Sequence, residues 1–255
     1  MLIAPKLSAP VVLVHGVSGF ARLFCAREAA ESFPGIRAYF EGGGNRVLTP
    51  RLSPTAGIAT RAAELRAFVK RELGGQPFHL IGHSLGGLDA RFLISRLGLH
   101  AQVRSLTTVG TPHRGTAFAD WGIARLSRVL SPLFRACGVA ADCFFDLTTD
   151  ACRRFNEDTP DAPNVRYFSV AGVCEEPWLT AGWRVPAGVV RRFEGANDGI
   201  VSVASATWGE RTEVWEGDHL NLVNRPNKRM RKAGEWTDRR ERYGALLGQL
   251  QACGM

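Results

Sequence analysis

Ten residues, segment 78–87, constrain most strongly what this chain can fold into. The segment begins as an apolar run and ends in the pattern G-x-S-x-G, and an amphipathic stretch, 88–97, follows it. This order predicts a strand, a sharp turn and a helix, with Ser84 at the turn. Because the strand and the helix crowd such a turn, its neighbours must be small, and Gly82 and Gly86 meet that demand. We therefore interpret the segment as a nucleophile elbow rather than a simple glycine-rich turn.

Strand and helix patterns alternate along the whole sequence. Short apolar or β-branched runs predict strands at 11–14, 46–49, 78–81, 102–109, 164–170 and 211–215, and amphipathic spacing predicts helices near 22–32, 55–73, 88–97 and 235–251. Residues 117–156 interrupt the alternation with helical spacing, and 178–193 is expected to be a loop with a hairpin. We predict a single α/β domain over 1–255 with a doubly wound, mostly parallel sheet and an inserted helical cap at 117–156.

Composition excludes several classes of protein. Hydrophobic content of 45% and a mean hydropathy of −0.07 are typical of a globular protein with a sizeable core, and no apolar run is long enough to span a bilayer. Residues 1–10 lack the pattern of a secretory signal, which favours the cytoplasm over secretion. The 6 cysteines show no C-x-x-C pair and no metal-binding spacing, so we expect them to be free and buried.

The net charge of +8 is concentrated in segment 225–242, which contains eight arginines and lysines and three acids. A basic segment of this kind attracts anionic lipid or nucleic acid. Trp236 is its only aromatic residue, and no nucleic-acid-binding motif accompanies it. We interpret the segment as a solvated basic face and expect no nucleic-acid partner.

A serine hydroxyl needs a general base, and the base needs a carboxylate that orients it. Behind a nucleophile elbow the chain order is serine, acid, histidine, each on a loop that follows a strand. Three histidines follow Ser84. His100 falls at the far end of the elbow helix and His113 in the loop after the next strand, whereas His219 follows the last predicted strand. We predict that His219 is the base.

The predicted acid is Asp198, which stands between the fifth and the last predicted strands, in a turn with Gly199. Asp218 is the alternative, but a residue adjacent to His219 cannot easily reach Nδ1 of the same ring. The other candidates precede the fifth strand and are expected to cap helices or face solvent: Asp146, Asp150 and Asp161.

An oxyanion hole needs two backbone N–H groups. The residue after the nucleophile, Leu85, supplies one, and the loop after the first strand supplies the other, for which we predict Val17. His15, in the same loop, is expected to be a structural hydrogen-bonding residue.

Six motifs in order carry a family resemblance: Val14-His-Gly-Val17, Gly82-His-Ser-Leu-Gly-Gly87, Gly110-Thr-Pro-His-Arg-Gly115, Tyr167-Phe-Ser-Val-Ala-Gly172, Asn197-Asp-Gly-Ile-Val-Ser202 and Asp218-His-Leu220. With them the chain resembles the bacterial true lipases of the Pseudomonas and Burkholderia type over residues 11–223. The resemblance implies an α/β-hydrolase fold, hydrolysis of carboxylic esters, and the triad Ser84, Asp198 and His219.

The resemblance also implies that residues near 117–150 form a mobile lid over an apolar acyl pocket. The lid residues expected to contact the acyl chain are Ile123, Leu126, Leu130, Leu133 and Phe134. The alternative is a fixed helical insertion packed on the core. We expect an acyl ester or lipid as substrate and transient contact with a lipid surface.

The sequence departs from this family at the positions that bind calcium. The family has an aspartate two positions after the histidine, where this chain has Asn221, and a second about twenty positions before the acid, where it has Trp178 with Glu175 and Glu176 nearby. We therefore expect no metal and no cofactor.

Three other functions are compatible with the same residues to different degrees. A short-chain carboxylesterase, and an acyltransferase or lipid deacylase, would use the same triad and differ in the substrate or in the group that accepts the acyl chain. A non-catalytic binding protein is disfavoured, because it is expected to lack at least one member of the triad, and none is missing here.

Overall fold

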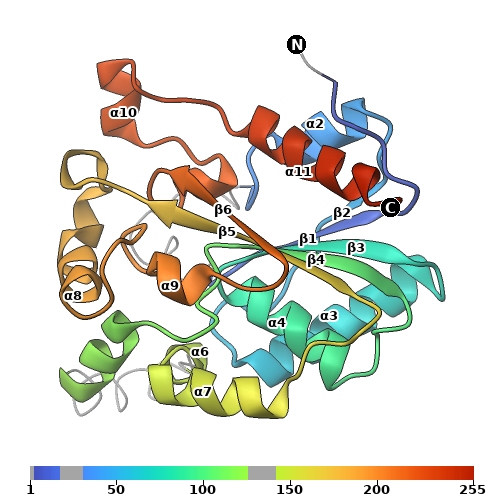
Figure 1. Cartoon of the computed structure of the whole chain (residues 1–255), viewed down its shortest axis with the longest axis horizontal. Coiled ribbons are helices and arrows are strands. Elements are labelled where there is room, and N and C mark those ends of the chain that lie inside the picture. Colours follow the sequence, from blue (N-terminus) through green and yellow to red (C-terminus); the bar gives the residue numbers. More distant parts are fainter. Residues whose placement is uncertain (1–2, 18–30, 126–141) are drawn as a thin grey trace.

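A computed structural model describes residues 3–17, 31–125 and 142–255 (Figure 1). Within these ranges six strands form one parallel sheet in the order β2-β1-β3-β4-β5-β6. The strands are β1 (Val11–Val14), β2 (Val47–Leu48), β3 (Phe78–His83), β4 (Val103–Val109), β5 (Arg166–Val173) and β6 (Arg211–Glu216). Every strand expected from the sequence is present.

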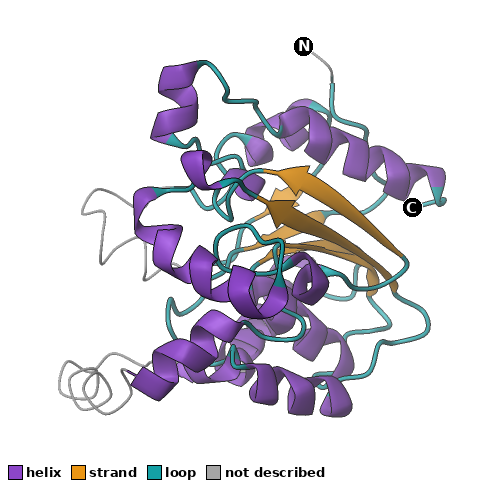
Figure 2. Ribbon diagram, turned by 60° about the vertical axis from the view of Figure 1, so that its left-hand side comes forward, coloured by secondary structure: helices purple, strands orange, loops and turns teal. Residues whose placement is uncertain are grey.

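The helices are α2 (Ile36–Gly42), α3 (Ile58–Leu73), α4 (Leu85–Ser95), α6 (Asp142–Asp146), α7 (Thr149–Asp158), α8 (Arg184–Glu194), α9 (Val203–Ala206), α10 (Lys228–Ala233) and α11 (Arg240–Ala252). Short 3₁₀ turns are η1 (Glu176–Trp178), η2 (Ala181–Trp183) and η3 (Asn221–Val223). α3 and α4 cover one face of the sheet, and α2 and α11 cover the other (Figures 1 and 2). The predicted doubly wound parallel sheet is therefore confirmed. None of the helices described here is long and apolar enough to cross a bilayer.

Strand β1 shows why its residues form a central strand. All four of its residues are buried, and they alternate between two cores. Val11 and Leu13 pack with side chains of α2 and α11, whereas Val12 and Val14 pack with side chains of α3 and α4. A strand covered on both faces is a continuous apolar run, as in parallel sheets generally. These two cores fix the carboxyl ends of the strands, from which the functional loops emerge.

Segment 178–193 differs from the prediction, since the expected loop with a hairpin is wrong. The segment contains the 3₁₀ turn η2 and most of α8. Pro186 and Gly188 lower helix propensity and hid the helix from pattern analysis, but proline is tolerated where it occurs here, in the first turn. The last helix also begins later than expected, at Arg240 rather than residue 235.

The predicted cap is described only in part. Residues 117–125 are helical, and α6 and α7 make up most of its second half. Ile123 is half-buried in the first of these helices. Four predicted lid residues lie outside the described residues: Leu126, Leu130, Leu133 and Phe134. Most of the expected helix 22–32 also lies outside them.

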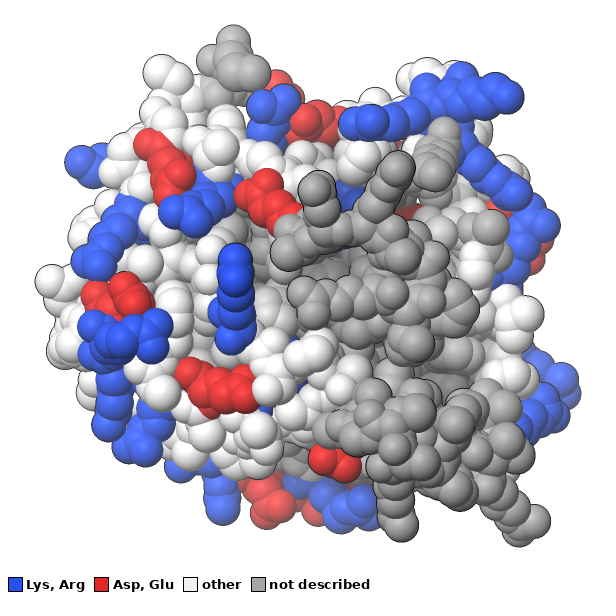
Figure 3. Space-filling view, turned by 180° about the vertical axis from the view of Figure 1, so that it is seen from behind, with Lys and Arg blue, Asp and Glu red and all other residues white. Residues whose placement is uncertain are grey.

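The basic segment 225–242 is only partly a solvated face. Its helix α10 projects from the body of the molecule, and Lys and Arg side chains gather over it at the upper right of Figure 3. Arg239, however, is buried and donates a hydrogen bond to the Glu216 carbonyl. Part of the positive charge of the segment therefore holds its own chain against the end of β6.

The described cysteines agree with the prediction of free thiols. Cys143, Cys152 and Cys174 are free and buried, and burial raises the pKa of each thiol to about 12. Cys253 is free but exposed, so the expectation of burial is wrong for this residue.

Candidate active site

Ser84 occupies a strained turn between β3 and α4. Its backbone has φ 55° and ψ −129°, which few residues other than glycine adopt. A Cβ on Gly82 would lie 2.7 Å from the Gly87 Cα, and one on Gly86 would lie 2.5 Å from the Val14 carbonyl oxygen. The strand and the helix start are thus as crowded as the sequence predicted. The turn places Ser84 at the carboxyl end of the central strands.

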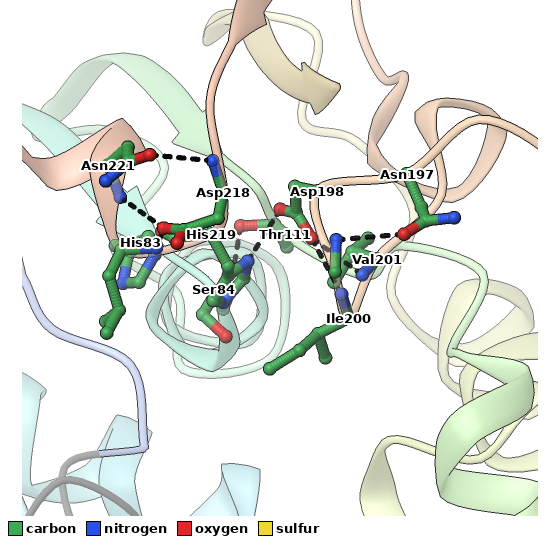
Figure 4. Close-up of polar contacts among 12 residues, drawn as sticks. His83, Ser84, Thr111, Asn197, Asp198, Ile200, Val201, Asp218, His219 and Asn221 are labelled. Atoms are coloured by element: carbon green, nitrogen blue, oxygen red, sulfur yellow. Dashed lines mark hydrogen bonds and ion pairs between the residues drawn. The ribbon is translucent and has the colours of Figure 1, made fainter. Parts of the chain in front are cut away.

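Asp198 and His219 form a buried hydrogen-bonded pair (Figure 4). Nδ1 of His219 lies 2.7 Å from Oδ2 of Asp198, and the His219 N–H donates to the Asp198 carbonyl at 2.8 Å. Oδ1 of Asp198 accepts the N–H groups of Ile200 at 3.0 Å and Val201 at 2.8 Å. Because the carboxylate accepts from Nδ1–H, Nε2 of the neutral ring is free to accept a proton.

The loop after β4 lies between this pair and the serine turn. A Cβ on Gly110 would lie 3.1 Å from His219 Nδ1 and 3.2 Å from Asp198 Oδ2, so only a glycine fits against the pair. Next to it, the Thr111 hydroxyl donates to the Ser84 carbonyl at 2.8 Å. The loops after β4, β5 and β6 therefore meet at the elbow, and the three residues predicted from the sequence come together.

His83, the residue before the serine, was assigned no role in the sequence analysis. Its ring centroid lies 4.5 Å from that of His219, and its Nε2–H donates to the His219 carbonyl at 3.0 Å. Burial, followed by the nearby His219 ring, lowers the pKa of His83 well below its usual value. His83 is thus a neutral donor that positions the His219 backbone. The position of His83 inside the G-x-S-x-G motif, next to Ser84, was the sequence feature from which a role near the site could have been predicted.

The other candidate histidines lie elsewhere. His113 is buried, shares a hydrogen bond of 2.9 Å between Nε2 and the Thr108 hydroxyl, and stacks on Trp208 with ring centroids 5.0 Å apart. Burial lowers the pKa of His113 well below its usual value. His100 is exposed after α4. Neither of these histidines is placed to accept a proton from Ser84.

The loop after β1, which carries the predicted oxyanion residue Val17, lies against the serine. A Cβ on Gly16 would lie 2.6 Å from the Ser84 Cβ and 3.3 Å from its Oγ, so the backbone of this loop is adjacent to the hydroxyl. Leu85 is the first residue of α4, where an N–H has no acceptor within the helix. The ring of His15 links to the Gly16 carbonyl and accepts from Leu52 N–H, a structural role as expected.

A buried arginine joins the two sides of this arrangement. The side chains of Arg61 and Asp89 are fully buried, and Nε of Arg61 lies 2.8 Å from Oδ2 of Asp89 on α4. Nη2 of Arg61 donates to the His15 carbonyl at 2.6 Å, and Nη1 donates to the Ser53 carbonyl at 2.6 Å. Burial raises the pKa of Asp89, and the Arg61 charge opposes that shift. One guanidinium thus ties the helix that begins at Leu85 to the loop that carries Val17.

Neither Arg61 nor Asp89 was singled out in the sequence, although a signal existed. Ile58, Arg61 and Leu65 recur at the spacing of one helix face, so an arginine falls in a row of core positions. A charge at such a position indicates a buried partner.

An apolar cluster adjoins the predicted oxyanion residues. Leu85 and Val17 pack in it with side chains of α3, α4, α6 and α7. A groove of about 350 Å³ opens between α3 and α7, and it is lined by Ile58, Phe92 and Phe155 but also by Asp142 and Asp146. The apolar cluster, rather than this groove, suits the hydrocarbon part of a substrate.

The residues near His219 do not fit the calcium site of the resembled family. Both oxygens of Asp218 are already engaged: Oδ1 accepts two backbone N–H groups, and Oδ2 accepts the Thr180 hydroxyl at 2.7 Å and the Asn227 amide at 3.1 Å. The Asn221 amide oxygen accepts the Asp218 N–H at 3.0 Å. No cluster of three or more His, Cys, Asp or Glu side chains that could hold a metal occurs in the described ranges. The side chains of Thr180 and Asn227 therefore link the segments before η2 and α10 to the loop after β6.

Comparison with known proteins agrees with this geometry. A family model described as palmitoyl protein thioesterase matches residues 10–148. Triacylglycerol lipase 2 of Saccharomyces cerevisiae is 30% identical over an alignment of 268 positions, which covers 86% of this chain and 81% of that protein. A triacylglycerol lipase of Vibrio cholerae is 28% identical, with 84% of this chain and 79% of that protein covered.

Solved structures share the fold. Lipase 1 from Pelosinus fermentans superposes with a TM-score of 0.71 at 17% identity, over 95% of this chain and 98% of that one. The mature form of the Bacillus licheniformis lipase BlEst2 gives a TM-score of 0.64 at 23% identity, over 88% of each chain. The implied α/β-hydrolase fold is thereby confirmed.

Replacing Arg61 is expected to slow turnover because it releases the loop from α4. A single Arg61→Met leaves Asp89 buried and unpaired, which costs about 3–5 kcal/mol. The double variant Arg61→Met/Asp89→Asn removes that charge. We expect both variants to lose about 100-fold in kcat on an ester substrate, with little change in KM, as for loss of an oxyanion donor. If the double variant regains wild-type kcat along with its melting temperature, Arg61 serves stability alone.

Removal of metal is expected to leave this protein unchanged. EDTA should alter neither the melting temperature nor the rate, because Asp218 is held by side-chain donors. Asn227→Ala removes one of those donors and should lower the free energy of unfolding by about 1–3 kcal/mol. Asn164→Ala, at an exposed position, is the matched control and should change it by about 0.5 kcal/mol or less. A melting temperature that falls in EDTA would show that a metal links these loops.

Proposed function

Because the chain belongs to the family of α/β-hydrolases that includes triacylglycerol lipases, we propose that it cleaves carboxylic esters of acyl lipids, with Ser84 as the nucleophile. The observation that carries the proposal is the buried Asp198–His219 pair, 2.7 Å between Oδ2 and Nδ1, held against the strained turn of Ser84. We assign Nε2 of His219, the ring nitrogen that Asp198 does not bind, as the base for Ser84.

In the acylation step Ser84 Oγ attacks the ester carbonyl carbon, and Nε2 of His219 takes the hydroxyl proton. Asp198 keeps the ring oriented and stabilises the imidazolium. The carbonyl oxygen becomes negative and accepts hydrogen bonds from the N–H groups of Leu85 and Val17, aided by the positive end of the α4 dipole. The bond to the leaving alkoxide then breaks, and His219 returns the proton to it.

Deacylation repeats the cycle with water. His219 takes a proton from water, and the hydroxide formed attacks the acyl carbon bound to Ser84. The same two N–H groups hold the second oxyanion. Ser84 leaves with the proton from His219, and the free fatty acid is released.

The apolar surroundings of the serine favour a lipid acyl chain over a short acid. The cluster around Val17 and Leu85 offers hydrocarbon contacts, and each CH₂ buried contributes about 0.8 kcal/mol. A substrate of this kind resides in lipid assemblies, so the enzyme meets it at a lipid surface. A short-chain carboxylesterase would gain nothing from these contacts.

A second candidate function is the cleavage of acyl thioesters, and one observation supports it. The family model that matches residues 10–148 is described as palmitoyl protein thioesterase. The proposed steps apply to a thioester equally, since only the leaving group changes from alkoxide to thiolate.

Hydrolysis of p-nitrophenyl esters from acetate to palmitate tests the proposal. We expect kcat/KM to rise with chain length, because the acyl chain leaves water as it binds. Ser84→Ala should remove the activity on every ester. Asp198→Asn should lower kcat by about 10⁴-fold, because the ring loses its orienting carboxylate. Comparing kcat/KM for a palmitoyl thioester with kcat/KM for the palmitate ester decides between ester and thioester cleavage.

Two outcomes would contradict parts of this assignment. Wild-type protein no faster than Ser84→Ala on all esters and on the thioester would exclude the hydrolase mechanism. Activity confined to acetate and butyrate would replace the lipid substrate by a short-chain ester and leave the triad assignment standing.

A further inference from the structure

Helix α8 exposes an apolar stripe to solvent. Val185 is 61% exposed and Phe193 is 67% exposed, among the most exposed large apolar side chains of the described chain. Val189 lies midway between them, so the three recur every four residues on one side of the helix. Ala187 and Val190 face the interior instead. The apolar face of α8 therefore extends beyond the part that is buried against the fold, and packing does not require this exposed part.

Arginines surround this stripe. A groove of about 500 Å³ runs between α8 and the helical residues 117–125, and it is lined by Trp121, the apolar stripe and three arginines: Arg125, Arg184 and Arg192. No acidic residue occurs among the described lining residues. Arg125 lies over Trp121, 5.0 Å from the guanidinium carbon to the ring centroid. Glu194, at the end of α8, is turned away from this charge, since it accepts from Ala117 N–H and the Ser202 hydroxyl.

The start of α8 lies next to the proposed catalytic site. Trp183, which immediately precedes α8, has its ring centroid 5.8 Å from that of His219. Asn227, the N-cap of α10, contacts the carbonyl of Trp178 and the hydroxyl of Thr180, just before η2. The cationic helix α10 therefore joins the same side of the molecule as α8 (Figure 1).

We propose that the outer side of α8 docks on the surface of an anionic phospholipid bilayer. Apolar side chains at the interface and arginines beside them are the features by which a helix lies in the plane of a membrane. Charge complementarity favours this occupant: phosphate groups match Arg125, Arg184 and Arg192, and Val185 and Phe193 enter the acyl boundary. The proposal goes beyond ester hydrolysis, and docking does not depend on the chemistry of Ser84.

Sedimentation with vesicles tests the proposal in the Ser84→Ala background, so that no lipid is consumed. Neutral phosphatidylcholine vesicles are compared with vesicles that also contain phosphatidylglycerol. We expect binding to the anionic vesicles, weakened by salt. Adding Arg184→Gln/Arg192→Gln should weaken that binding about 30-fold, because each arginine near an anionic surface contributes about fivefold. Adding Phe193→Ser should weaken it about tenfold.

The matched control is Arg66→Gln/Lys70→Gln, which removes two exposed positive charges from α3, on another side of the molecule. It should bind anionic vesicles like the parent. All variants change exposed residues and should keep the parent melting temperature, which checks folding.

Four results would overturn the proposal. They are equal binding to neutral and anionic vesicles, no loss of binding in the α8 variants, an equal loss in the α3 control, and a dimer of the parent that Phe193→Ser dissociates. The last would identify a second copy of the chain as the occupant of the stripe. Because binding is measured without Ser84, failure of the proposed hydrolysis would leave these results unaffected.

Discussion

The buried Asp198 carboxylate is the interaction on which the rest of the site depends. A carboxylate removed from water costs several kcal/mol unless its oxygens are hydrogen bonded. Two backbone N–H groups and the His219 ring satisfy it here. The loops after β5 and β6 must therefore keep their places, and the neighbouring parallel strands hold them there. The orientation of the histidine follows from satisfying a buried charge.

A second buried charge organises the opposite side of Ser84. Arg61 must donate to acceptors wherever it is buried, and it finds them on Asp89, His15 and Ser53. These residues belong to α4, to the loop after β1 and to the loop before α3, so satisfying the guanidinium also fixes α4 relative to the loop that carries Val17. The side chains of Asp198 and Arg61, both buried, thus fix the groups on the two sides of Ser84.

Much of the fold and the three central side chains could be predicted, because each of them has a recognisable pattern in the neighbouring sequence. Glycines flank the turn at Ser84, a turn with Gly199 follows Asp198, and His219 stands just after a strand. The supporting contacts have no such pattern, because they join residues far apart in the sequence. Arg61 bonds to Asp89 across 28 positions, and Thr180 bonds to Asp218 across 38. Helix α8 was missed for another reason, since Pro186 and Gly188 lower helix propensity within it.

The exposed apolar stripe of α8 also bears on how a lipid would reach Ser84. A long acyl chain that crosses water exposes every CH₂ at a cost of about 0.8 kcal/mol each. A docking helix beside the site shortens that path, because Trp183 at its start touches His219, and the apolar cluster around Val17 and Leu85 lies at the serine. Membrane contact at Val185 and Phe193 would then bring the bilayer close to the His219 side of the site. The same apolar exposure that disfavours α8 in water would thus lower the barrier to substrate transfer.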